Sequence, residues 1–424
     1  PSAVYAAGSE VYVTSYSTNT LAIFDASDPG NLEPIGYSTS NLSGPTDVFV
    51  SGQRAYVTSQ LNSRLVVFDI SNPSQPDSLG STDERLTNPV AVYVAGKYAY
   101  VASYGRTQEP VVRGGLAIYD ISDPKNIRLR DFVETNLANP TDLFVAGDYA
   151  YVTSTGNDQM AIFDVSDPRP GQVRALGFAS GAFVAPMAVH VNGPYAYVVA
   201  YQADRLTIFD VSDPNSVVRV GATNTNLNWP KDILVAGDLA YVASEQNDRL
   251  AIFDISDPAN IVAKGFADTG TDSRPVSLFV TGKWVYVASE AADMLSVYEV
   301  NHLETPTLQT GSLQTGYLDV EDNAAISNDL AVHGGLQVGG GGALIDGALS
   351  VTGPDGSHIL GALSVGGAGA LVSDTVFTTR TQWVAAPTHA LDVVGEGRFR
   401  VNDYHNLVVR SPNAGSDEDA YIDF

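Results

Sequence analysis

The sequence contains no cysteine, so disulfides, thiol catalysis and cysteine-based metal sites are excluded. Basic residues are also scarce: 22 Lys and Arg stand against 48 Asp and Glu, which gives a formal net charge of −26. A surface this acidic repels phosphate backbones and anionic lipid headgroups, so we expect binding neither to nucleic acid nor to a membrane surface. No apolar stretch approaches the roughly 18 residues of a spanning helix, and no membrane insertion is expected.

Recognisable catalytic motifs are missing too. The sequence has no GxSxG, no P-loop and no HExxH. Of the six histidines only His190 lies in a predicted strand, and none has a partner at metal-ligand spacing. We therefore predict structural histidines, no catalytic residue and no cofactor, with calcium or another cation left open.

What the chain does have is a repeated phrase. LAIFDASDP at 21–29 recurs at 65–73, 116–124, 160–168, 206–214 and 250–258, and a diverged copy, LSVYEVNHL, occupies 295–303. The seven repeat units begin at Pro1, Pro45, Pro89, Pro140, Pro186, Pro230 and Pro275. Each unit has four short runs rich in Val, Ile, Tyr and Phe, which alternate with period two and end in turn-forming residues. This pattern predicts four strands per unit and an all-β, seven-bladed β-propeller.

The repeated phrase also resembles a known family. LVVFDISNP (65–73) and LAIFDISDP (250–258) are similar to the signature of the LVIVD repeat, found in β-propellers of bacterial and archaeal surface proteins. The resemblance covers roughly residues 1–310 and implies a propeller scaffold. It implies no catalytic residue.

The aspartates of the phrase allow two interpretations. Asp25 and Asp28 have equivalents in other units, such as Asp164 and Asp167. A carboxylate at the end of a strand commonly accepts hydrogen bonds from N–H groups of the following turn. Calcium sites instead concentrate several oxygen ligands in one loop with a defining glycine. The turn role is therefore favoured over a repeated calcium site.

The sequence that follows the repeats has a different pattern. We predict a propeller over 1–310, a linker over 311–325 and a glycine-rich β-strand stem over 326–424. Short phrases such as LAV, LQV and ALSV alternate apolar and small residues but offer few large side chains. Strands of this kind need partners from other chains, which predicts a homotrimer formed through 326–424. A flexible glycine-rich linker is the alternative.

Part of this region carries a second resemblance. PTHALDVVGEGRFRVN (387–402) is similar to a phrase in trimeric phage tail fibres and bacterial surface fibres; the matching residues are Pro387, Leu391, Asp392, Val393, Gly395 and Arg398. The Gly-Ile-Gly-Thr lead-in and the terminal chaperone of such fibres are absent from this sequence. The resemblance implies a trimeric stem and does not separate a viral from a cellular origin.

The third position of the units is a candidate site. It is Asp47, Asp142 and Asp232 in units two, four and six, and Ala3, Ala91, Ala188 and Ser277 in the others. If the first strand of each unit is innermost, these side chains encircle one mouth of the central channel. Three carboxylates there can hold a cation or a cationic ligand. Alternatively, each carboxylate binds the backbone of the neighbouring blade.

An insertion in the third unit is the other candidate site. The segment YGRTQEPVVRGG (104–115) lengthens one loop and carries Tyr104, Arg106, Glu109 and Arg113. Insertions in a single repeat often lie on the binding face, so these four residues are predicted to bind a ligand. A tolerated loop extension is the alternative.

The sequence thus predicts a non-enzymatic extracellular protein on a cell surface or virion. In this interpretation a propeller head on a trimeric stem serves adhesion, receptor recognition or fibre assembly. Its predicted partners are further copies of itself, a cell-surface glycan or protein receptor, and other fibre components. The alternative is a secreted propeller enzyme, a hydrolase or lyase acting on sugars or lactones, with its site at the channel mouth.

Overall fold

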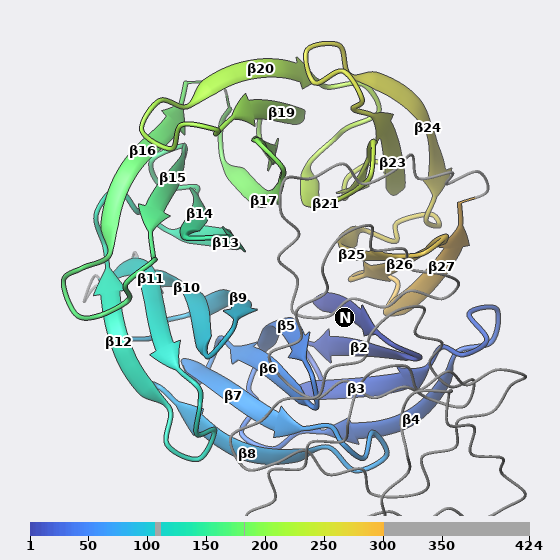
Figure 1. Ribbon diagram of the computed structural model, residues 1–424. Helices are drawn as coiled ribbons and strands as arrows, with labels where there is room; N and C mark the ends of the chain where they lie inside the picture. Colours follow the sequence, from blue (N-terminus) through green and yellow to red (C-terminus); the bar gives the residue numbers. More distant parts are fainter. Residues whose placement is uncertain (107–111, 182, 301–424) are drawn as a thin grey trace, which may run out of the picture. The chain divides into compact units, whose positions relative to one another are not determined.

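The computed structural model describes residues 1–106, 112–181 and 183–300, and these form a propeller of seven antiparallel sheets (Figure 1). Each sheet, or blade, is a meander whose strands pair in sequence order, with the first strand nearest the centre and the last at the outer edge. The predicted all-β, seven-bladed propeller is confirmed. In the described part of the chain there is no helix long and apolar enough to cross a membrane.

The blades follow the predicted repeat units. Blade 1 contains β1 (Ala3–Ala7), β2 (Glu10–Ser15), β3 (Thr20–Asp25) and β4 (Glu33–Ser38); blade 2 contains β5 (Pro45–Ser51), β6 (Arg54–Ser59), β7 (Arg64–Asp69) and β8 (Asp77–Thr82); blade 3 contains β9 (Pro89–Ala95), β10 (Tyr98–Arg106), β11 (Val112–Asp120) and β12 (Arg128–Val133); blade 4 contains β13 (Pro140–Ala146), β14 (Tyr149–Ser154), β15 (Gln159–Asp164) and β16 (Arg174–Ser180); blade 5 contains β17 (Pro186–Asn192), β18 (Tyr195–Ala200), β19 (Arg205–Asp210) and β20 (Val218–Thr223); blade 6 contains β21 (Pro230–Ala236), β22 (Leu239–Ser244), β23 (Arg249–Asp254) and β24 (Val262–Asp268); blade 7 contains β25 (Pro275–Thr281), β26 (Trp284–Ser289) and β27 (Met294–Glu299).

The hydrophobic core lies between the blades. Seven clusters of buried apolar side chains each join two neighbouring sheets, so no blade buries its faces alone. The cluster between blades 2 and 3, for example, packs Leu65 and Val67 against Val92 and Val101. Such β-branched and aromatic side chains fit a pleated surface that is covered on both faces.

In each of the first six blades, the repeated phrase forms the third strand and the turn that leads to the fourth. Its first aspartate accepts a hydrogen bond from the N–H two residues later, as Asp25 does from Ser27 at 2.8 Å and Asp210 does from Ser212 at 2.9 Å. The hydrogen bond from the N–H of Ser27 lowers the pKa of Asp25, and those from the hydroxyl and the N–H of Ser212 lower the pKa of Asp210. The favoured turn role is therefore confirmed for these aspartates.

The proline of the same turn contacts the blade before it. A Cβ built on Gly221 of β20 would lie 2.1 Å from the carbonyl oxygen of Pro258, which belongs to the next blade. Gly80 stands in the same relation to Pro124, also at 2.1 Å. The glycine of the fourth strand thus lets the following blade's turn approach closely, which explains why both features recur together.

The seam between the first and last blades is closed by packing and one polar contact. β1 contacts β25 and β26, and Val4 and Val13 pack in one cluster with Tyr286 and Ala288. The backbone N–H of Val4 also donates to Ser277 Oγ at 3.2 Å. Among the described strands none is exchanged between the two blades, because all four strands of blade 1 come from its own repeat unit.

The predictions for the rest of the chain lie outside the described residues. The propeller belongs to the first of two units into which the chain divides, Pro1–Ser327. The end of the predicted propeller, the linker over 311–325 and the trimeric stem over 326–424 all follow residue 300. Their fold, the trimer and the extracellular location stay predictions.

Candidate functional site

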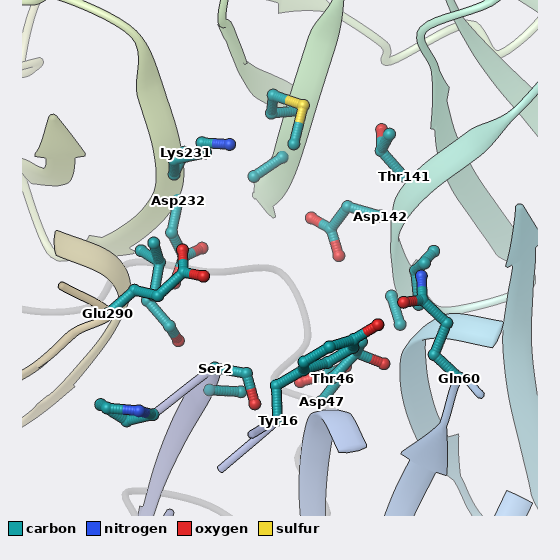
Figure 2. A pocket seen from close by; sticks show the side chains of 18 of the residues that line it. Ser2, Tyr16, Thr46, Asp47, Gln60, Thr141, Asp142, Lys231, Asp232 and Glu290 are labelled. Carbon is teal, nitrogen blue, oxygen red and sulfur yellow. The ribbon is translucent and has the colours of Figure 1, made fainter. Parts of the chain in front are cut away.

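The candidate site is a cavity at one mouth of the central channel, which we call the pit. Its volume is about 450 Å³, and residues of all seven blades line it. Most of these residues stand at or near the start of the innermost strands, where each unit enters the ring (Figures 1 and 2). The repeat therefore places equivalent positions side by side around the pit, although they are far apart in the sequence.

The pit contains the three aspartates predicted to share a channel mouth. Figure 2 shows the carboxyl groups of Asp47, Asp142 and Asp232 in one hollow, with Lys231 next to Asp232. The structure thus brings this predicted group together. It does so because the first strand of each unit is the innermost one, as that prediction assumed.

Each of the three carboxylates also joins its blade to the next. The second oxygen, Oδ2, of each one accepts a backbone N–H of the following blade, with Asp47 bound to Val92 at 2.7 Å and Asp142 to Val189 at 2.8 Å. Asp232 accepts from Leu278 at 2.7 Å in the same way. The alternative interpretation, backbone bonding between neighbouring blades, is therefore confirmed.

Removal from bulk water raises the pKa of all three aspartates. The pKa of Asp47 rises to about 6, because desolvation outweighs its hydrogen bonds from Val92 and Val48. The pKa of Asp142 rises well above its usual range: desolvation is the largest cause, and the charges of Asp232 and Asp47 add to it. Desolvation also raises the pKa of Asp232. Asp142 thus holds its proton most strongly, since both other carboxylates disfavour its charge.

The described residues contain no group of three or more His, Asp and Glu side chains placed to hold one metal ion. One oxygen of each of the three aspartates accepts a backbone N–H of a different blade, and these bonds hold the carboxyl groups at separate places around the pit. A cationic ligand at this mouth stays a prediction.

A belt of aromatic rings lies one layer along the inner strands from the aspartates. The ring of Tyr5 is 5.1 Å from that of Phe49, and the series continues through Tyr93 and Phe144 to His190 at centroid distances of 4.6 to 5.0 Å. Burial lowers the pKa of His190 to about 4, so its imidazole is neutral at pH 7. None of these rings is among the described residues that line the pit, so the belt lies outside this lining.

The insertion in the third unit contributes one residue to the pit. Tyr104 lines it, at the point where β10 leaves the rim. Arg106 and Arg113 lie farther out on the same hairpin and are exposed, because β10 and β11 continue as paired strands through the segment predicted as a loop. Glu109 lies outside the described residues.

The rim of the pit at blades 5 and 6 has a chemistry that the sequence prediction missed. Lys231 is the only basic side chain among the described residues that line the pit, and its Nζ lies 3.3 Å from Oε2 of the buried Glu245. The same Nζ lies 4.4 Å from the ring centroid of Tyr201, which stacks on Trp229 at 4.8 Å. The signal in the sequence was a tryptophan before the unit's proline, where the other units have Gly44, Asn88, Asn139, Ala185 and Arg274.

Comparison with known proteins identifies the class of this propeller. The profile of the family described as "Lactonase, 7-bladed beta-propeller" matches residues 10–316, more than half of the chain. The chain therefore belongs to the seven-bladed propeller lactonase family. No curated protein matches it.

Solved structures share the fold at low sequence identity. A "putative 6-phosphogluconolactonase" from Bacteroides uniformis has a TM-score of 0.57 at 16% identity, over 70% of this chain and 93% of that chain. A second protein so described, from Bacteroides fragilis, has a TM-score of 0.54 at 15% identity, over 72% and 91%. A functionally unknown protein from Desulfotomaculum acetoxidans has a TM-score of 0.57 at 14% identity, over 68% and 92%.

The family corrects the prediction of a non-enzymatic fibre protein for adhesion or receptor recognition. That prediction was wrong because it took the repeated phrase as pure scaffold and found no catalytic motif elsewhere. In a propeller the chemical groups come from equivalent positions on different blades, so they form no contiguous motif. The alternative, a propeller enzyme with its site at the channel mouth, agrees better with the family and with the pit. The LVIVD and fibre-stem resemblances stay predictions.

Proposed function

We propose that this protein hydrolyses a lactone in the pit. The observation that carries the proposal is the pair of carboxyl groups, Asp47 and Asp142, that share one cavity yet hold their protons to different extents. Two titratable groups whose environments separate their pKa values can serve as base and acid in one reaction. Membership of the lactonase family supports the choice of substrate class.

In the proposed reaction Asp47 is the general base and Asp142 the general acid. Above pH 6 the carboxylate of Asp47 takes a proton from a water molecule, whose oxygen bonds to the carbonyl carbon of the lactone. The tetrahedral intermediate then breaks its ring C–O bond, and the leaving oxygen takes the proton of Asp142. The product is a hydroxy acid. Proton exchange with water restores both groups, so no cofactor is consumed.

The charge of the pit favours an unphosphorylated substrate. A phosphate group needs cations or free N–H donors around it, and the one basic side chain among the described residues of the lining, Lys231, is paired with Glu245. Above pH 6 the carboxylate of Asp47 in the same hollow would repel a phosphate dianion. We therefore propose a neutral lactone and not the 6-phospho form named in the descriptions of the two Bacteroides structures.

The test is a pH–rate profile with glucono-1,5-lactone and the full chain, measured as acid release in a pH-stat against a protein-free blank. We expect the catalysed rate to rise with pH through about 6, because protonated Asp47 cannot act as a base. The rate should fall again at higher pH, where Asp142 loses the proton that it must donate. A catalysed rate that never exceeds the blank between pH 4 and 9 would contradict the proposal.

A further inference from the structure

Trp229 occupies a backbone position that disfavours a large side chain. Its φ is 56°, in the left-handed region, and the equivalent residues before the prolines of the other units share this conformation: Gly44, Asn88, Asn139, Ala185 and Arg274. Glycine and asparagine adopt it at little cost, whereas a bulky residue there is a strained outlier. The turn itself does not require the indole. It is held by a hydrogen bond from the backbone N–H of residue 229 to Asp204 Oδ1, which does not involve the side chain of Trp229. Side chains as different as those of Asn139, Ala185 and Arg274 occupy the same turn, so the fold leaves the choice of side chain at this position open.

The indole offers an exposed aromatic face beside the pit. Trp229 is 39% exposed, and its ring stacks on Tyr201 with an angle of 29° between the planes. Lys231 connects this pair to the pit, since its Nζ lies over Tyr201 and its side chain lines the cavity. Together Trp229, Tyr201, Lys231 and Glu245 form what we call the rim platform.

The chemistry of the rim platform selects an uncharged, ring-shaped, hydroxylated ligand. The aromatic faces suit the apolar C–H face of a sugar ring, while the ammonium of Lys231 and the carboxylate of Glu245 can donate to and accept from hydroxyl groups. A cationic ligand would meet the charge of Lys231. An anionic ligand would meet the carboxylate of Glu245 and, above pH 6, that of Asp47.

We propose that the rim platform is a second sugar subsite, so that the substrate is a lactone carrying at least one further uncharged sugar unit. The inference rests on the proposed function for the lactone in the pit and adds the unit that lies outside it. The pit takes the reacting ring, and the platform takes the next ring of the chain. The enzyme would then act on the lactone end of an oligosaccharide.

The test compares cellobiono-1,5-lactone with glucono-1,5-lactone in the wild-type protein and in Trp229→Asn. In the wild type we expect the disaccharide lactone to have a KM about tenfold lower, the size of effect that one well-placed aromatic contact gives. Trp229→Asn should remove that difference and leave kcat for glucono-1,5-lactone unchanged. Because asparagine suits the left-handed turn, the variant should melt no lower than the wild type.

Two further variants serve as controls. Trp229→Phe keeps an aromatic face and should keep part of the preference for the disaccharide. Phe178→Thr removes an exposed aromatic ring from the outer strand β16 and should not change the preference. Equal KM values for the two lactones in the wild type, or an unchanged preference in Trp229→Asn, would overturn the proposal.

A binding measurement separates the subsite from the reaction. Cellobiose cannot be hydrolysed at a lactone bond, so its binding by calorimetry depends on the sugar contacts alone. If cellobiose binds the wild type and binds Trp229→Asn about tenfold more weakly, the result supports the rim platform as a sugar subsite. This holds even if no lactone is hydrolysed, because that result would contradict only the proposed function. If both lactones are hydrolysed but Trp229→Asn binds cellobiose as tightly as the wild type does, the subsite proposal is contradicted. The proposed function is then unaffected.

Discussion

Replacing Asp142 by asparagine is expected to lower kcat for lactone hydrolysis by a factor of roughly 10² to 10⁴, the usual contribution of a general acid. Asparagine has nearly the shape of aspartic acid, and its oxygen can still accept the N–H of Val189 that bridges blades 4 and 5. It has no proton to give to the leaving oxygen. The pH–rate profile of this variant should also lose its decline at high pH, because that decline reports Asp142.

Asp232→Asn is the matched control, since Asp232 makes the same kind of bridge between blades 6 and 7. Both variants should lose similar stability in thermal unfolding, which removes the structural contribution from the comparison. Their effects on kcat should differ by at least tenfold if Asp142 acts as the acid. Equal losses of activity in the two variants would mean that the carboxylates only hold the blades together.

Replacing Gly221 by alanine is expected to destabilise the propeller by about 3 kcal/mol, near the upper end of the usual cost of overpacking. The new methyl group would stand 2.1 Å from the carbonyl oxygen of Pro258, and the obstacle is backbone that cannot rotate away. Blades 5 and 6 must therefore separate or tilt. Because every apolar cluster joins two blades, a shift at this interface also loosens the packing of Leu206 and Ile233.

Gly265 provides the control because it is the equivalent glycine of blade 6. Its φ of 159° is one that L residues rarely adopt, but a Cβ built there meets no described atom within 4 Å. Gly265→Ala should therefore add backbone strain without a steric clash, and it should lower the urea midpoint less than Gly221→Ala does. If both alanine variants unfold at the wild-type midpoint, the close approach of the turns does not limit the packing of the blades.

The fold could be predicted from the sequence because its information is local and repeated. Each strand is set by the alternation within its own unit, and each turn by an aspartate that bonds an N–H two residues later, as Asp25 does with Ser27. Seven copies then determine the ring. The loop predicted at 104–115 was partly a hairpin, because the backbone pairs Gly105 with Arg113 and extends the sheet past the rim.

The site could be predicted only in part. The alternation of Asp47, Asp142 and Asp232 with alanine showed that these positions share a mouth. Their protonation could not be predicted, because it depends on the removal of water by neighbouring blades and on charges far away in the sequence. The stacking of Trp229 on Tyr201 joins residues of two blades, and only the angle between blades decides whether they meet.

The acidity of the pit has a consequence for turnover. A product formed there lies beside Asp47, Asp142 and Asp232. Hydrolysis converts the neutral lactone into a hydroxy-acid anion that is surrounded by acidic side chains. The reaction therefore lowers the affinity of the pit for its product. An acidic pit would thus bind the neutral lactone more tightly than the anionic product. We therefore expect the accumulating product to be a weak inhibitor.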